Sequence, residues 1–192
     1  MRKLTVDDIK DLREYERERP EFRARIIDMK KRRRIHLGDI LTLTFENTDT
    51  MRYQVQEMAR AERMLSDEQI AHEVETYNQL VPADGELSGT LFVEITKKDG
   101  LYEWLPKLVD IQRAVALRVD GTEVRAVPDD EERLTREETT STVHYLKFPM
   151  APEPRAAFAA GPVHLVVDHP NYQTDVELTP EQREELAGDL AG

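Results

Sequence analysis

The fold is decided in residues 39–80, which read DILTLTFENTDTMRYQVQEMARAERMLSDEQIAHEVETYNQL. In the first part, Asp39–Glu46, apolar side chains alternate with polar ones, and this period of two predicts a β-strand. The remainder changes to helical spacing over residues 50–65 and again over 67–80, with Ser66 as a typical helix start between them. We therefore expect a strand followed by a helical hairpin.

The pattern upstream of this strand is helical as well. Thr5, followed by two aspartates, is typical of a helix N-cap and predicts a helix that breaks or restarts at Pro20. The restarted segment runs to about Arg32, and its Phe22, Ile26 and Met29 form an apolar stripe at helical spacing that we expect to be buried. We interpret residues 1–34 as an N-terminal helical arm and residues 35–192 as a single α+β domain.

The pattern beyond residue 82 is mainly β. Short alternating stretches predict strands, and Asp120-Gly121 is a strong hairpin signal between two of them. The predicted strands cover residues 90–96, 114–119, 123–127, 142–148, 163–168 and 173–178. Short helices are expected near residues 101–109 and after Thr179. The order fits an α+β fold, with N-terminal helices and a helical hairpin packed on a mainly antiparallel sheet, or a partly open barrel, of about six to seven strands.

The composition excludes several classes of protein. The chain has 192 residues, a formal charge of -12 and no Cys, which excludes disulfides, thiolate metal sites and a cysteine nucleophile. No apolar run approaches the roughly 20 residues of a membrane helix, and a signal-peptide pattern is missing, so we expect a cytoplasmic protein that does not bind membranes. The sequence also lacks a glycine-rich phosphate loop, a dinucleotide fingerprint and a nucleophile elbow, which argues against a nucleotide-dependent enzyme.

Charge is divided unevenly along the chain. Residues 1–34 carry 13 Lys or Arg and 8 Asp or Glu, a net of +5, whereas the remainder carries 14 basic and 31 acidic side chains, a net of -17. The sharpest basic cluster is the run Lys30, Lys31, Arg32, Arg33 and Arg34. We interpret it either as a contact for phosphate or an acidic partner or, preferably, as a basic helix end that docks on the chain's own acidic body. Nucleic-acid binding is disfavoured, because that body repels a polyanion.

Two glutamates of the helical hairpin stand where apolar side chains are expected. At about 100° per residue, Glu62 lies near the centre of the apolar arc of the first helix, and Glu73 lies inside the arc of the second. An unpaired buried carboxylate is costly, so each must be protonated, paired with a cation or bound to a metal. His144 alternates in phase with Leu146 and Phe148 and is expected to face the core.

Two hypotheses account for these carboxylates. The favoured one is a buried ion-pair cluster in which arginines of the N-terminal helix reach the two glutamates; its members are Glu62, Glu73, His144, Tyr77, Arg25 and Arg33. The alternative is a metal or proton-transfer site for a divalent ion such as iron, manganese or zinc. Its ligands would be Glu62, Glu73, His144 and His72. The Glu-x-x-His spacing of di-iron bundles is missing from both helices.

Several strings in the chain resemble a known family. They are RRRIHLG at 32–38, LTLTFEN at 41–47, TMRYQVQEM at 50–58 with Arg60, Glu62 and Arg63, His72-Glu73 with TYN at 76–78, and Ser141 with VHYLKF at 143–148. Together they are similar to a prokaryotic family catalogued as domain of unknown function 3501, over nearly the whole chain. The resemblance implies a single-domain bacterial cytoplasmic protein with no established reaction. The shared motifs contain Glu57, Glu62, His72, Glu73, Tyr77 and His144, without a role for any of them.

The resemblance also carries a genomic association. Genes of this family have neighbours that encode rubrerythrin-like and iron–sulfur proteins, which implies an accessory role in peroxide or redox metabolism. Together with the missing catalytic signatures and the uneven charge, this favours an accessory protein that binds a protein partner, or a second copy of itself. A metal-binding protein or metal-dependent enzyme is the alternative.

Overall fold

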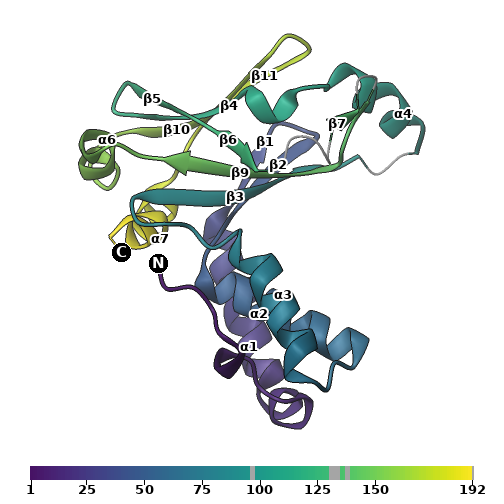
Figure 1. Cartoon of the computed structure of the whole chain (residues 1–192). Helices are drawn as coiled ribbons and strands as arrows, with labels where there is room; N and C mark the ends of the chain where they lie inside the picture. The colour runs from purple at the N-terminus through teal and green to yellow at the C-terminus, as the bar shows by residue number, and fades with distance from the viewer. Residues whose placement is uncertain (96–97, 130–134, 137–138, 192) are drawn as a thin grey trace.

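The structure is a computed structural model that describes residues 1–95, 98–129, 135–136 and 139–191, and its strands form two main antiparallel sheets (Figure 1). The larger sheet has the order β1-β2-β3-β9-β6. Its strands are β1 (Arg34–Leu37), β2 (Leu41–Glu46), β3 (Glu86–Val93), β6 (Val127–Asp129) and β9 (Val143–Pro149). The smaller sheet has the order β11-β10-β4-β5. Its strands are β4 (Val115–Val119), β5 (Thr122–Arg125), β10 (Val163–His169) and β11 (Tyr172–Glu177).

Helices and short elements complete the described part of the chain. The α-helices are α1 (Leu12–Arg33), α2 (Thr48–Glu62), α3 (Asp67–Asn78), α4 (Lys98–Lys107), α6 (Pro152–Ala157) and α7 (Pro180–Leu190). Two 3₁₀ turns, η1 (Val6–Asp8) and η2 (Ile111–Arg113), and a ribbon of β7 (Thr135–Arg136) with β8 (Thr139–Thr140) are added. The predicted α+β class with mainly antiparallel sheets is confirmed. The strands divide between two main sheets of five and four strands, and these do not close into a barrel.

The two faces of the larger sheet differ in chemistry because side chains alternate along each strand. On one face, Leu43 and Leu146 pack with Leu117 and Leu165 of the smaller sheet in a single apolar core. The opposite face carries polar side chains that are also buried, namely Thr42, Thr44, Glu46, Ser88 and Thr90. The larger sheet therefore separates the apolar core of the sandwich from a polar layer on its other side.

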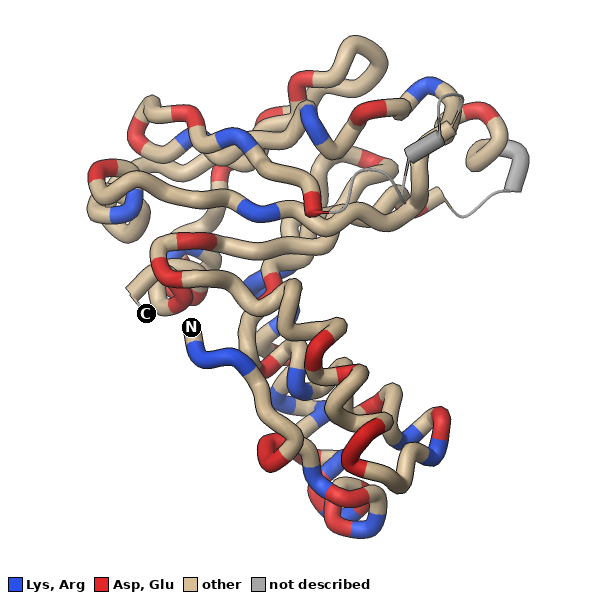
Figure 2. The backbone as a smooth tube through the Cα atoms, viewed as in Figure 1, with Lys and Arg blue, Asp and Glu red and all other residues tan. Residues whose placement is uncertain are grey.

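Helices α1, α2 and α3 form an arm that projects from the larger sheet (Figure 1). A second, smaller core of Met51, Val55 and Val74 joins α2 to α3, which confirms the predicted helical hairpin. The side chains of Asn47 and Ser66 cap the two helices, as their residue types favour. Acidic and basic positions are interspersed along the arm, as Figure 2 shows.

The predicted helix break at Pro20 is wrong, because α1 runs through this residue without interruption. Pro20 is exposed, so the carbonyl group that loses its N–H partner one turn earlier lies on the solvent side and can be hydrated. The helix starts at Leu12, where the Asp11 side chain accepts hydrogen bonds from two backbone N–H groups. Thr5 caps only the short turn η1.

Helix α1 belongs to the same arm as the hairpin, since it packs against α2 and its last turn also reaches α7. The division of the chain at residue 34 stays a prediction. Within the described ranges, no helix has both the length and the hydropathy that a membrane span requires.

Candidate functional site

The structure does not bring the predicted cluster of Glu62, Glu73 and His144 together. Glu62 is the last residue of α2 and is exposed, so its predicted inward orientation is wrong. The helix ends here because Arg63 adopts the left-handed conformation, with φ 53, and the chain turns. After Ala59, the next buried residue along the chain is Met64 and not Glu62.

The other predicted ligands lie on different sides of the larger sheet. Glu73 and Tyr77 of α3 are half-buried, and His72 is exposed. His144 is buried in phase with Leu146, as predicted, and its Nε2 atom lies 2.9 Å from Thr140 Oγ1 and 3.1 Å from the Ser141 carbonyl. Burial lowers the pKa of His144, which favours the neutral ring. Its neighbour Tyr145 faces the hairpin, so His144 points away from it.

These positions leave no metal centre of the predicted kind. Among the residues that the structure describes, no group of three or more His, Asp or Glu side chains is arranged to hold a metal ion. The predicted partners of the glutamates are also elsewhere. Arg33 lies at the base of the arm, and Arg25 stacks on an aromatic ring.

Arg33 is fully buried and binds acceptors from two other elements. Its guanidinium pairs with Asp189 and, at 3.2 Å, with Glu185 of α7, and it donates to the backbone carbonyls of Phe45 and Glu46 at 2.9 and 3.3 Å. The adjacent basic residues also dock internally, since Arg32 pairs with Glu185 at 2.9 Å. The basic end of α1 therefore binds the chain's own acidic body, as the favoured interpretation of the run predicted.

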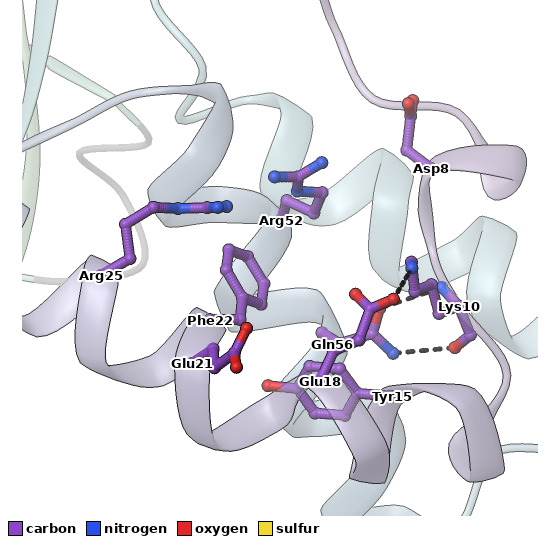
Figure 3. Close-up of a pocket in the computed structure, with 9 residues that line it drawn as sticks. All are labelled: Asp8, Lys10, Tyr15, Glu18, Glu21, Phe22, Arg25, Arg52 and Gln56. Atoms are coloured by element: carbon purple, nitrogen blue, oxygen red, sulfur yellow. Dashed lines mark hydrogen bonds and ion pairs between the residues drawn. The ribbon is translucent and has the colours of Figure 1, made fainter.

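A pocket that the sequence did not reveal lies on the arm, between α1, α2 and the segment that precedes α1 (Figure 3). Its volume is about 290 Å³. The lining residues are Asp8, Lys10, Tyr15, Glu18, Glu21, Phe22, Arg25, Arg52 and Gln56. Helical spacing places Tyr15, Phe22 and Arg25 on one side of α1, whereas Arg52 and Gln56 come from one face of α2.

Phe22 forms the centre of this pocket. The guanidinium carbons of Arg25 and Arg52 each lie 5.0 Å from the centroid of its ring, within the range of a cation–π contact. Edge-on contacts with Tyr15 and Tyr53, at centroid distances of 6.4 and 5.7 Å, hold the ring in place. Two cations from different helices thus converge on one aromatic ring (Figure 3).

The two arginines keep donors that the described residues do not use. Arg52 pairs with Asp49 at 2.9 Å through one terminal nitrogen, but its Nε atom is buried without a partner. Arg25 makes no ion pair with any described residue and is exposed. Asp8 is bound by Arg2 at 2.6 Å, and this guanidinium holds the pKa of Asp8 well below its usual range. The guanidinium of Arg25 is therefore open to an external acceptor, whereas the Nε atom of Arg52 is enclosed by the protein.

The floor of the pocket is fixed by a separate ion pair. Arg19 donates to both oxygens of Glu57 at 2.7 and 2.8 Å, and the Tyr15 hydroxyl donates to the same carboxylate at 2.6 Å. The bonds from Arg19 lower the pKa of Glu57, while burial and the bond to Glu57 raise the pKa of Tyr15. Tyr15 therefore stays protonated and Glu57 stays ionised at neutral pH. The geometry suits binding rather than proton transfer.

The sequence pattern predicted Arg25 as a member of the ion-pair cluster and Phe22 as part of a buried apolar stripe, but it assigned no role to Arg52. The available signal was the i, i+3 spacing of Phe22 and Arg25, which puts a cation beside an aromatic ring on a helix. The contribution of Arg52 depends on how α2 packs against α1, which a single sequence does not show.

The fold and the pocket define a two-sheet α+β protein with a projecting helical arm, whose pocket is lined by aromatic side chains and by charged side chains of both signs. The chain belongs to the family described as "Protein of unknown function (DUF3501)", whose model matches residues 3–190. A crystal structure of a protein of unknown function from Burkholderia pseudomallei K96243 is similar to it, with 36% sequence identity and a TM-score of 0.90. The similarity covers 98% of this chain and 100% of that one. Comparison with curated proteins found no match.

Proposed function

We propose that this protein is an accessory binding module whose helical arm recognises an acidic segment of a protein partner. The observation that carries the proposal is the convergence of Arg25 and Arg52 on Phe22, with the exposed Arg25 free of any ion pair to a described residue. Guanidinium groups are well suited to carboxylates, because their planar fork matches the two carboxylate oxygens. A carboxylate of the partner, placed between Arg25 and Arg52, would pair with both guanidinium groups. No described acidic side chain does this.

The size and walls of the pocket favour a peptide side chain over a whole cofactor. A volume of about 290 Å³ lies at the low end of the roughly 300–1,000 Å³ that small-molecule pockets span. Phe22 and Tyr15 offer apolar surface for the stem of an acidic residue. Glu21, which has no ion pair among the described residues, stands at the rim as an acceptor for a peptide N–H group.

The proposal also includes the kind of partner that the arm binds and the place where it does so. The local net charge of +5 on residues 1–34 attracts an acidic segment to the arm, while the acidic body limits binding to short peptides over extended polyanions. A bacterial cytoplasmic location, and a partner from redox or oxidative-stress metabolism, rest on the family resemblance alone. The experiment below therefore tests the recognition chemistry first.

The test uses fluorescence anisotropy with labelled peptides of about a dozen residues. Each contains one Glu or Asp beside an apolar residue, and an isosteric set replaces it with Gln or Asn. We expect the acidic set to bind preferentially, with an affinity that falls as salt rises. The double variant Arg25→Gln/Arg52→Gln should weaken binding at least about tenfold, because two charge-assisted contacts are lost.

The matched control is Arg23→Gln, which removes an exposed arginine of α1 that does not line the pocket. This variant should bind the acidic peptides as tightly as the wild-type protein. Equal binding of the acidic and isosteric peptides, or unchanged binding by the double variant, contradicts the proposal. Displacement by inorganic phosphate and not by acetate would assign the pocket to phosphate and would also contradict it.

A further inference from the structure

A buried carboxylate at the base of the arm lacks a cationic partner. Glu46, the last residue of β2, is 4% exposed, and its Oε1 atom accepts a hydrogen bond from Thr90 Oγ1 at 3.1 Å. Its Oε2 atom is buried and has no hydrogen-bond partner within the described residues. An ionised carboxylate with one hydroxyl donor is poorly compensated at such a depth.

A second orphan atom lies directly opposite. Ser88 of β3 pairs with Glu46 in the strand register, is 1% exposed, and its Oγ atom is also without a hydrogen-bond partner. Directly paired residues have Cβ atoms about 5 Å apart on the same face. Thr90, two residues further along β3, is on this face too. One carboxylate and two hydroxyl-bearing side chains thus lie next to one another on the polar face of β2 and β3.

Two basic side chains in the neighbourhood of Glu46, Arg33 and Lys147, form ion pairs with other carboxylates. Arg33 contacts Glu46 only through the backbone carbonyl, at 3.3 Å, and directs its charge to Asp189. Lys147 of β9 is paired with Ser88 in the strand register, but its ammonium group forms an ion pair with Asp129 at 3.6 Å. No described basic side chain pairs with the Glu46 carboxylate.

From this geometry we infer that Glu46 and Ser88, with Thr90 beside them, form a site for a monovalent cation, Na⁺ or K⁺. All of its protein donors are oxygen atoms, which hard cations prefer. A single negative charge is neutralised by a single positive one, whereas a divalent ion would leave an excess positive charge in this buried position. The bound ion stabilises the join between β2 and α2, where Glu46 is followed by the N-cap residue Asn47.

The test measures the thermal midpoint Tm of the wild-type protein in NaCl, KCl and choline chloride at equal ionic strength. Because a ligand that binds only the folded state stabilises it by mass action, Tm should be higher by about 3 °C in 200 mM NaCl or KCl than in choline chloride. The shift should vanish in Glu46→Gln and shrink in Ser88→Ala. Glu94→Gln is the matched control, since this carboxylate already accepts bonds from Thr42 and Arg34.

A second measurement needs no variant and covers the case in which Glu46→Gln does not fold. The ²³Na resonance should broaden in the presence of wild-type protein, and added KCl should restore its width. Equal Tm values in all three salts, with no ²³Na broadening, overturn the proposal and leave Ser88 and Glu46 bridged by water. A Tm shift that appears only with MgCl₂ or CaCl₂ overturns the monovalent assignment as well.

Discussion

Two arginine clusters lie on the same helix, about two turns apart, and they differ in how their donors are used. At the C-terminal end of α1, Arg33 is fully buried and its guanidinium reaches two carboxylates and two backbone carbonyls. Midway along α1, Arg25 is exposed and contacts the Phe22 ring, as Arg52 of α2 does, and it makes no ion pair with a described residue. The Arg33 guanidinium binds acceptors within the fold, whereas the Arg25 guanidinium remains accessible to an external acceptor.

This difference separates a structural from a ligand-binding role for the same residue type. A buried guanidinium must find acceptors within the chain, because water cannot supply them. A partly exposed one can remain hydrated until an external carboxylate displaces the water. Substitutions at the two clusters should therefore differ in their effects on stability and on binding.

The largest effect is expected at the buried cluster. Arg33→Met should lower the free energy of unfolding by about 3–5 kcal/mol, because it leaves Asp189 buried without its cation. Urea unfolding followed by circular dichroism measures this loss. Arg32→Met, at the half-buried neighbour, is the control and should cost less than about 1 kcal/mol. A loss below 1 kcal/mol for Arg33→Met would remove the distinction between the clusters.

A smaller effect is expected at Glu57, under the pocket. Replacement by Gln should cost about 2 kcal/mol at pH 7, since the carboxylate holds both Arg19 and Tyr15. The pKa of Glu57 is lowered in the folded protein, so its contribution is present above the unfolded-state pKa of about 4.3 and is lost as pH falls through the lower folded-state value. The stability of Glu57→Gln should therefore fall less between pH 5 and pH 3 than that of the wild type. Parallel pH profiles would contradict this role.

The open cluster should matter little for stability. Arg25→Gln is expected to change the free energy of unfolding by less than about 0.5 kcal/mol, because the side chain is exposed and makes no ion pair with described residues. The same variant should weaken binding of the acidic peptides. Urea unfolding and anisotropy on one preparation separate the two readouts. A large stability loss would make the pocket a structural cluster like that of Arg33.

The smallest effect is expected at Glu62. Because this side chain is exposed at the end of α2, Glu62→Gln should leave the free energy of unfolding within about 0.5 kcal/mol of the wild type. Peptide binding should not change either. Elemental analysis of the variant and the wild type for iron, manganese and zinc completes the test. Loss of a stoichiometric metal in the variant alone would restore the metal hypothesis.

The sequence pattern predicted correctly the features that depend on a single helix or strand. The helical hairpin, the strand after Asp39 and the inward phase of His144 all follow from periodicity. The pattern predicted wrongly the features that depend on where a helix ends or on which side faces solvent. Glu62 falls on the apolar arc of an ideal helix, but α2 stops there, and Pro20 is tolerated because it faces water.

The sequence by itself determined the α+β class, the helical hairpin and the basic end of α1, since these depend on short-range spacing and charge. Only the tertiary structure decided which groups meet. Arg33 finds Asp189 across 156 residues of chain, and Arg52 joins Arg25 only because α2 packs on α1. Helix periodicity fixes the face on which a side chain stands, whereas its partner depends on packing between elements that are distant in the chain.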